Sequence, residues 1–147
     1  MLVPDAPVGM TSDIVGVGLD AVDVDRFRRS LERTTSLQSR LFTAQELLSL
    51  AGRVDPVPGL AARFAAREAA MKALGVGLGA FGFHDLWVDR LASGEPTLVV
   101  TGSARALMDL REVHRLHVSL THTRSSAQAI VLAVRHRPLR CPTCNPS

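Results

Sequence analysis

Aromatic side chains are scarce in this chain of 147 residues, which has no Tyr, one Trp and five Phe. A folded core must therefore be built mainly from Ala, Leu and Val, and a chain of this length is expected to form one globular unit. No apolar run approaches the roughly 18 residues that span a membrane, and residues 1–12 lack the charged and apolar regions of a secretory signal peptide. We therefore expect a cytoplasmic protein with no membrane partner.

Lysine is almost absent as well. Of the 17 Lys and Arg residues only Lys72 is a lysine, which suggests that this position requires a compact amine that planar Arg cannot imitate. The net charge of +3 and the pI near 9.6 favour an anionic partner, such as a nucleotide, a nucleic acid or an acidic protein surface. Because the basic residues do not alternate with aromatic ones and no nucleic-acid-binding motif is present, we do not expect a nucleic acid.

The segment over residues 60–74 predicts a long helix. Ala, Leu, Met and Glu dominate it, prolines precede it and Gly75 follows it. Glu68 and Lys72 lie one helical turn apart on a face that is otherwise apolar. Taken alone, the pair fits either an ion pair at the solvent edge, worth about 0.2–0.5 kcal/mol, or a metal and phosphate site.

Two further segments predict strands that end in polar residues. Residues 14–19 predict a buried strand that delivers Asp20 at its end, followed by a helix over 22–33. Residues 114–121 alternate between apolar and polar side chains and predict a strand that ends at His122. The apolar run over 127–134 predicts the partner strand.

The remaining pattern completes an α+β fold. We expect helices over 43–51 and 102–110, and strands over 84–90 and 96–101 that are joined at Ser93 and Gly94. The order of these elements predicts an antiparallel sheet packed against the long helix.

Five motifs in order resemble one family. They are Gly-x-Gly-x-Asp at 16–20, Arg-x-Phe-Thr-x-x-Glu at 40–46, Arg-Phe-Ala-Ala-basic-Glu-Ala-x-x-Lys-Ala-x-Gly-x-Gly at 63–77, Gly-x-Pro at 94–96 and Val-Ser-Leu-Thr-His at 118–122. At this spacing they resemble the holo-[acyl-carrier-protein] synthases, the small 4′-phosphopantetheinyl transferases. The resemblance covers residues 13–134, which we interpret as the transferase domain, with 1–12 as an N-terminal extension and 135–147 as a flexible tail.

The resemblance implies transfer of 4′-phosphopantetheine from coenzyme A to a serine of an apo acyl carrier protein, with Mg²⁺ required and 3′,5′-ADP released. It implies that Asp20 and Glu68 hold the metal, that Glu68 and Lys72 are catalytic, and that Lys72 contacts the phosphates. Such a displacement needs a cation on the pyrophosphate, positive charge on the developing oxyanions and an acceptor for the serine proton. Whether Glu68 is a metal ligand, a base or both stays open.

The resemblance also implies contacts to coenzyme A. By their places in the motifs, Arg63, Ser119, Thr121 and His122 contact the phosphates or the nucleotide. Arg67 stands where the family usually has lysine, and we expect it to keep a charge that faces phosphate, although Arg cannot act as a base. The alternatives are a solvated helix residue for Arg63 and a hydrogen-bonded structural residue for His122.

The family docks its carrier protein, typically acidic, on the first helix. Arg26, Arg29 and Arg33 are spaced three and four residues apart and therefore share one face of that helix. We expect them to bind the carrier; the alternative is an ordinary solvated face.

The short members of the family complete their active sites as trimers, so the resemblance implies a homotrimer here. The pathway that the carrier serves, fatty acid, polyketide or peptide synthesis, stays open.

Two other interpretations remain at this stage. One is a non-catalytic module of the same fold that binds coenzyme A or a carrier protein, suggested by Arg67; the other is an unrelated basic interaction protein.

Cys141 and Cys144 form a Cys-x-x-Cys pair in the tail. A closed zinc site needs four ligands and no second pair exists, so we expect an incidental dithiol there.

Overall fold

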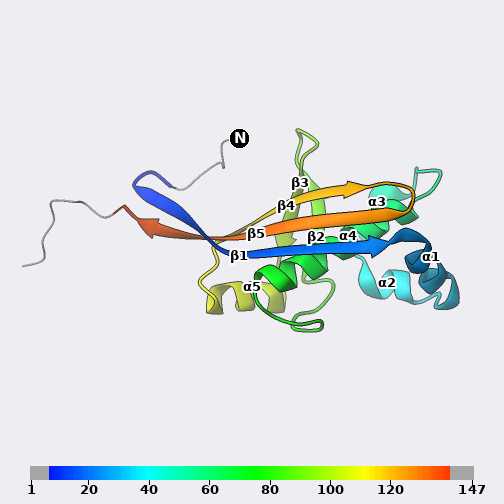
Figure 1. Ribbon diagram of the computed structural model, residues 1–147, viewed down its shortest axis with the longest axis horizontal. Helices are drawn as coiled ribbons and strands as arrows, with labels where there is room; N and C mark the ends of the chain where they lie inside the picture. The colour runs from blue at the N-terminus through cyan, green and yellow to red at the C-terminus, as the bar shows by residue number, and fades with distance from the viewer. Residues whose placement is uncertain (1–6, 140–147) are drawn as a thin grey trace, which may run out of the picture.

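The computed structural model describes residues 7–139. These residues form two antiparallel sheets and five helices (Figure 1). In chain order the elements are β1 (Met10–Asp23), α1 (Val24–Arg33), α2 (Leu37–Leu41), α3 (Ala44–Leu50), α4 (Val57–Ala73), β2 (Leu86–Arg90), β3 (Pro96–Val100), α5 (Gly102–Leu110), β4 (Arg115–His122) and β5 (Ser126–Pro138). The larger sheet has the strand order β1-β5-β4, and β2 pairs with β3. The predicted α+β class with antiparallel pairing is confirmed, but the sequence pattern indicated neither the division into two sheets nor the short helix α2.

Helix α4 packs mainly on β1 and β5 of the larger sheet, as the prediction of a long helix against an antiparallel sheet required. It begins at Val57, three residues before the predicted start, because Pro58 is tolerated in the first turn, where the backbone N–H groups have no helical partner. It ends before Gly75, whose positive φ of 70° breaks the helical path.

Two glycines allow β1 to lie directly against the backbone of α4. A Cβ atom on Gly18 would stand 1.7 Å from the carbonyl oxygen of Ala69, and one on Gly16 would stand 1.9 Å from that of Ala73. Real Cβ atoms do not approach so closely, so any side chain at these two positions would push the strand away from the helix. The Gly-x-Gly-x-Asp motif therefore places Asp20 beside the helix.

Helix α4 is buried on almost all sides but keeps one open stripe. Phe64, Glu68 and Lys72 follow each other at intervals of four residues and are the side chains of its middle and last turns that are not buried. Since residues at this spacing lie above one another on a helix, they form a single column on the least buried side of α4, with Phe64 still packed beside Phe27 and Phe83. This column is the part of α4 that can carry chemistry.

The remaining elements enclose the two ends of α4. Helices α1, α2 and α3 surround its N-terminal half over a core that includes Phe27, Phe42 and Leu60. At the other end, the side chain of Asp85 accepts hydrogen bonds from the backbone N–H and the hydroxyl of Ser103, which fixes the start of α5. None of the helices in the described part of the chain has the length and hydropathy to cross a membrane.

The paired strands extend past both predicted domain boundaries. Met10 pairs with Pro138 and Asp13 with Arg135, so residues 10–12 and 135–138 belong to the larger sheet and not to an extension or a tail. The apolar alternation that predicts strands is missing there; backbone pairing and polar contacts hold the ends, among them an ion pair of 2.8 Å from Arg137 to Asp13. Cys141 and Cys144 lie outside the described residues.

Candidate active site

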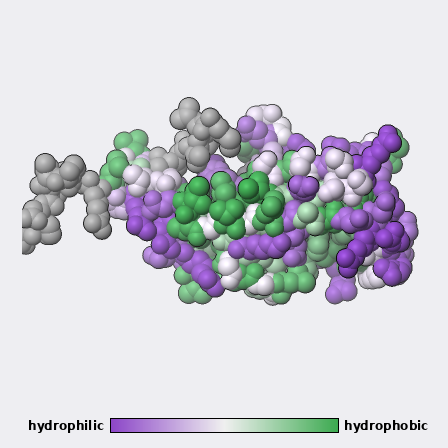
Figure 2. All heavy atoms as spheres, viewed as in Figure 1, coloured by the Kyte–Doolittle hydropathy of each residue, from purple (hydrophilic) through white to green (hydrophobic). Residues whose placement is uncertain are grey.

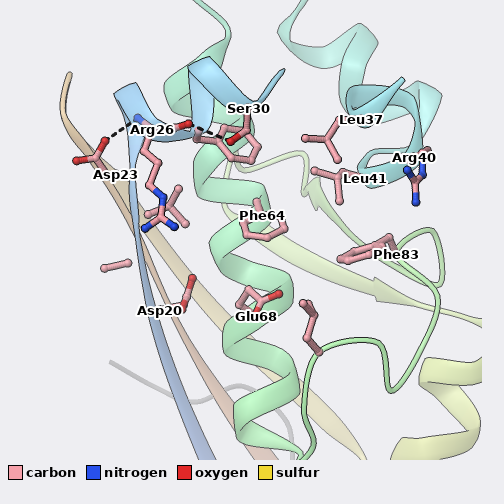
Figure 3. Close-up of a pocket in the computed structure, with 14 residues that line it drawn as sticks. Asp20, Asp23, Arg26, Ser30, Leu37, Arg40, Leu41, Phe64, Glu68 and Phe83 are labelled. Atoms are coloured by element: carbon pink, nitrogen blue, oxygen red, sulfur yellow. Dashed lines mark hydrogen bonds between the residues drawn. The ribbon is translucent and has the colours of Figure 1, made fainter. Parts of the chain in front are cut away.

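A cavity of about 750 Å³ opens between the C-terminal end of β1, the helices α1 and α2, and the open column of α4 (Figure 3). Its polar side chains at the β1 end are Asp20, Asp23 and Glu68. Its apolar side chains lie toward α2 and the loop before β2, and the lining includes Phe27, Leu37, Leu41, Phe64, Leu78 and Phe83. Arg26 and Arg40 bring positive charge to it. The cavity therefore has acidic side chains together with Arg26 at its β1 end, and apolar side chains together with Arg40 toward α2 (Figure 3).

Asp20 and Glu68 form the acidic end. Asp20 comes from β1 and Glu68 from α4, and both line the cavity, Asp20 from the strand side and Glu68 from the helix (Figure 3). The Oε1 atom of Glu68 is buried and has no hydrogen-bond partner among the described residues. Burial, reinforced by the nearby Asp20 carboxylate and opposed by Lys72, raises the pKa of Glu68. A buried carboxylate oxygen without a partner is expected where a ligand or cation belongs.

Lys72 crosses from the helix to the strand. Its Nζ lies 2.8 Å from Oδ1 of Asp20 and donates a second hydrogen bond of 2.9 Å to the carbonyl oxygen of Leu19. About half of its side chain is exposed. The structure therefore brings together the three residues Asp20, Glu68 and Lys72 that the sequence motifs single out, with the ammonium group at the solvent side.

Arg67 does not lie where we expected it. Its side chain is fully buried and forms a two-bond ion pair with Glu46, with donor-to-acceptor distances of 3.0 and 2.6 Å. Its Nε donates to the carbonyl oxygen of Phe83 at 2.9 Å, and its guanidinium carbon lies 5.3 Å from the ring centre of Phe42. The prediction that Arg67 faces phosphate is therefore wrong for this structure, because every nitrogen of its guanidinium is already engaged inside the core.

Arg63 is also buried, between α4 and α3. It donates to the carbonyl oxygen of Gly59 at 3.3 Å and to the hydroxyl of Ser49 at 3.1 Å. Burial lowers the pKa of Arg63, although the nearby Glu46 opposes this. It does not line the cavity that contains Asp20 and Glu68, so neither the predicted contact to coenzyme A nor a solvated position describes it.

The β4 residues lie apart from the cavity within one chain. Ser119, Thr121 and His122 are exposed on the strand that β5 separates from β1, and none of them lines the cavity. Their predicted contacts to coenzyme A therefore require a second copy of the chain or a ligand that extends beyond the cavity.

On α1, Arg26, Arg29 and Arg33 are all exposed, and Arg26 reaches the cavity (Figure 3).

Glu46 was not among the predicted site residues, although it is the buried partner of Arg67. Its carboxylate also accepts a hydrogen bond from the backbone N–H of Val88 at 3.2 Å. Its place in the Arg-x-Phe-Thr-x-x-Glu motif was the available signal, and its capping box with Thr43 explains half of that motif.

Comparison with known proteins identifies the family. The model of the 4′-phosphopantetheinyl transferase superfamily matches residues 16–134. The chain belongs to this superfamily. A holo-[acyl-carrier-protein] synthase of Streptomyces avermitilis is 46% identical over 82% of this chain and 97% of its own length, and one of Micrococcus luteus is 44% identical over 83% and 93%.

Solved structures of the superfamily share the fold. The crystal structure of a holo-[acyl-carrier-protein] synthase from Neisseria meningitidis has a TM-score of 0.75 at 30% identity and covers 82% of this chain and 98% of its own. A synthase from Bacillus anthracis in complex with CoA (3′,5′-ADP) has a TM-score of 0.69 at 29% identity, with 83% and 97% covered. The matched region of the superfamily contains Asp20, Glu68 and Lys72.

Proposed function

We propose that this chain is a holo-[acyl-carrier-protein] synthase, which transfers 4′-phosphopantetheine from coenzyme A to a serine hydroxyl of an apo acyl carrier protein and releases 3′,5′-ADP. The observation that carries the proposal is that Asp20 and Glu68 line one cavity and that Lys72 forms an ion pair with Asp20 beside it, in a chain of this superfamily. Curated relatives with this name cover most of the chain, and a structural relative is described in complex with CoA.

The acidic end of the cavity fits a magnesium ion. Glu68 offers a buried oxygen without a partner and Asp20 a second carboxylate beside it. No group of three or more His, Cys, Asp or Glu that could hold a metal occurs between residues 7 and 139. Magnesium typically binds through one or two carboxylates together with waters and substrate phosphates, so two carboxylates suffice. A bound Mg²⁺ would neutralise charge on the pyrophosphate during the transfer.

The side chains around this point have complementary tasks. Lys72 reaches the solvent side of the acid pair and can move from Asp20 to an incoming phosphate, where its charge stabilises the developing oxyanion. Glu68, whose pKa is raised by burial, is suited to accept the proton of the serine hydroxyl, directly or through a water. The apolar side chains that line the cavity, among them Phe27, Phe64 and Phe83, exclude water from its far end.

The carrier protein is proposed to dock on α1. Arg26, Arg29 and Arg33 are exposed on this helix, which follows directly after the strand that bears Asp20. Arg26 also lines the cavity, so a carrier bound to α1 presents its serine next to the acid pair. An acidic carrier surface complements this charge, and the attraction acts mainly on the rate of encounter.

The assembly is proposed to be a homotrimer that joins copies through the open face of the larger sheet. This face, opposite α4, exposes apolar side chains on β1 and β5: Val17, Leu19 and Ile130, between 40% and 62% exposed. Figure 2 shows an apolar patch where these strands lie in Figure 1. A second copy here would cover the patch and supply Ser119, Thr121 and His122 to a neighbouring cavity. Mg²⁺, the trimer and the cytoplasmic location remain predictions.

The alternative function, a binding module without catalysis, loses its main support. It was suggested by Arg67 in the position of a family lysine, and Arg67 is a buried partner of Glu46 instead of a missing catalytic group. Incubation of the chain with coenzyme A, Mg²⁺ and apo carrier protein separates the possibilities when carrier mass and coenzyme A binding are both measured. A mass gain of one phosphopantetheine indicates the enzyme, and binding of coenzyme A without a mass gain indicates the module. The absence of both binding and mass gain contradicts the proposed function.

A further inference from the structure

The apolar end of the cavity has two walls that come from different parts of the chain (Figure 3). Helix α2 supplies Leu37 and Leu41, and the loop between α4 and β2 supplies Leu78 and Phe83. Neither wall belongs to a sheet or to a long helix, so their separation depends on a few local contacts. This separation determines the width of the apolar end.

His84 joins the two walls by one hydrogen bond. Its Nε2 donates to the carbonyl oxygen of Ser39, in α2, at 2.9 Å. A carbonyl oxygen can only accept, so the proton of this bond lies on Nε2. The backbone N–H groups of α2 and its C-cap, by contrast, bond within residues 34–42. His84 therefore supplies a tie between α2 and the loop that the local bonds of the helix do not.

The sequence explains why the carbonyl group of Ser39 is free to accept this bond. In a continuing helix it would accept from the backbone N–H of Thr43, four residues later. Thr43 instead caps α3, and its N–H donates to Oε2 of Glu46 at 3.0 Å. The last carbonyl groups of a helix need a partner from outside the helix. His84 is that partner here.

The loop is held on both sides of His84. The carbonyl oxygen of Phe83 accepts from Nε of Arg67 at 2.9 Å, and the Phe83 ring stacks on Phe64 with ring centres 6.5 Å apart. On the other side, the carboxylate of Asp85 accepts from the backbone N–H of Ser103 at 2.9 Å. Because the backbone is fixed at both neighbours, the imidazole of His84 has a defined position from which to hold α2.

We infer that His84 is a positioning residue for the transfer reaction: through Ser39 it holds α2 against the loop and so sets the width of the apolar end. The inference rests on the proposed function and deepens it by assigning a residue that acts on substrate binding. His84 is exposed and does not line the cavity itself. Loss of its hydrogen bond should loosen the apolar end and leave the acidic end, with Asp20 and Glu68, unchanged.

The test compares His84→Gln with His84→Asn. The amide nitrogen of Gln stands near the position of the imidazole Nε2 and can donate to Ser39, whereas the shorter Asn cannot reach it. Steady-state transfer is measured with coenzyme A and apo carrier protein varied in turn. We expect His84→Asn to raise the KM of at least one substrate roughly 3- to 10-fold, the usual effect of losing a neutral hydrogen bond, with kcat within about twofold of the wild type. His84→Gln should match the wild type.

Two control variants change exposed residues that do not line the cavity. His114→Ala removes a histidine beside the start of β4, whose Nδ1 accepts a single hydrogen bond of 3.1 Å from the backbone N–H of His136. Arg105→Gln changes an arginine on α5. Both should keep the KM values of the wild type.

Other outcomes contradict the inference. Unchanged KM values for His84→Asn, or equal changes for His84→Asn and His84→Gln, show that the hydrogen bond to Ser39 does not control binding. A lower kcat with unchanged KM values places the effect on the chemical step, and an equal rise of KM in His114→Ala shows a general loss of stability. If the wild type transfers no phosphopantetheine, the proposed function fails and the inference fails with it.

Discussion

At the scale of single residues, the site is built from charges that the fold makes unfavourable until a ligand arrives. Glu68 is partly buried beside Asp20 and has an oxygen without a partner, and the ammonium group of Lys72 offsets only part of this cost. Such an arrangement trades stability for function, as active sites commonly do. Substitutions at these positions should therefore separate stability from activity.

Replacing Glu68 by Gln should stabilise the protein in the absence of metal while abolishing turnover. The pKa of Glu68 is raised in the fold, so the folded state holds its proton to higher pH than the unfolded state, and stability falls as pH rises from the unfolded pKa through the folded one. Glu68→Gln removes this loss. Thermal unfolding in chelator at pH 4 and pH 7 should show the gain at pH 7 only. A lower melting temperature for the variant at pH 7 would contradict the assigned burial cost.

Replacing Arg67 should reduce stability and not mainly substrate binding. Arg67→Met leaves Glu46 charged and buried without its partner, which typically costs about 3–5 kcal/mol. Arg67→Lys keeps the charge but loses the two-bond geometry, so it should fall between wild type and Arg67→Met. Urea unfolding measures the order. A double variant, Glu46→Leu with Arg67→Met, should recover much of the loss; additive losses would argue against a coupled pair.

At the scale of elements, the contact between β1 and α4 decides where the acid pair forms. Gly18→Ala places a methyl group into the carbonyl oxygen of Ala69, and overpacking of this kind costs roughly 1–3 kcal/mol or more. We expect Gly18→Ala to unfold at lower urea concentration and to lose activity, because Asp20 moves with the strand. Gly77→Ala is the matched control, since a Cβ there meets no atom within 4 Å. Equal effects of both substitutions would show that the close approach is unimportant.

The same elements show what the sequence could predict. Strand and helix types followed from periodicity, and Asp20, Glu68 and Lys72 from motif spacing, because local pattern determines both. The burial of Arg67 and Arg63 could not be read from sequence, because helix spacing does not tell which neighbours cover a side chain. Arg67 is next to Glu68 in the sequence, yet its side chain points into the core, because its ion-pair partner Glu46, 21 residues earlier, is buried there. Long-range pairing of this kind becomes visible only in the fold.

At the scale of the whole molecule, the open face of the larger sheet exposes apolar side chains that we propose a second copy of the chain covers. Leu19 is 62% exposed at the centre of that face, opposite Ile130. Leu19→Glu should shift the proposed trimer toward monomer in light scattering and lower activity with it, because charge in an apolar interface is costly. Leu48→Glu, on α3 and 75% exposed, is the control and should leave assembly intact. A monomeric, fully active wild type would contradict the shared site.

The central claim is that phosphopantetheine is transferred at the cavity lined by Asp20 and Glu68, with Lys72 paired to Asp20 beside it. Intact mass spectrometry of apo acyl carrier protein, incubated with coenzyme A and Mg²⁺, tests it with the wild type, Asp20→Ala and Arg105→Gln side by side, after circular dichroism shows that each is folded. The account predicts that wild type and Arg105→Gln add one phosphopantetheine, that excess chelator stops them, and that Asp20→Ala adds none. Transfer by Asp20→Ala at the wild-type rate, or by the wild type in excess chelator, would contradict it.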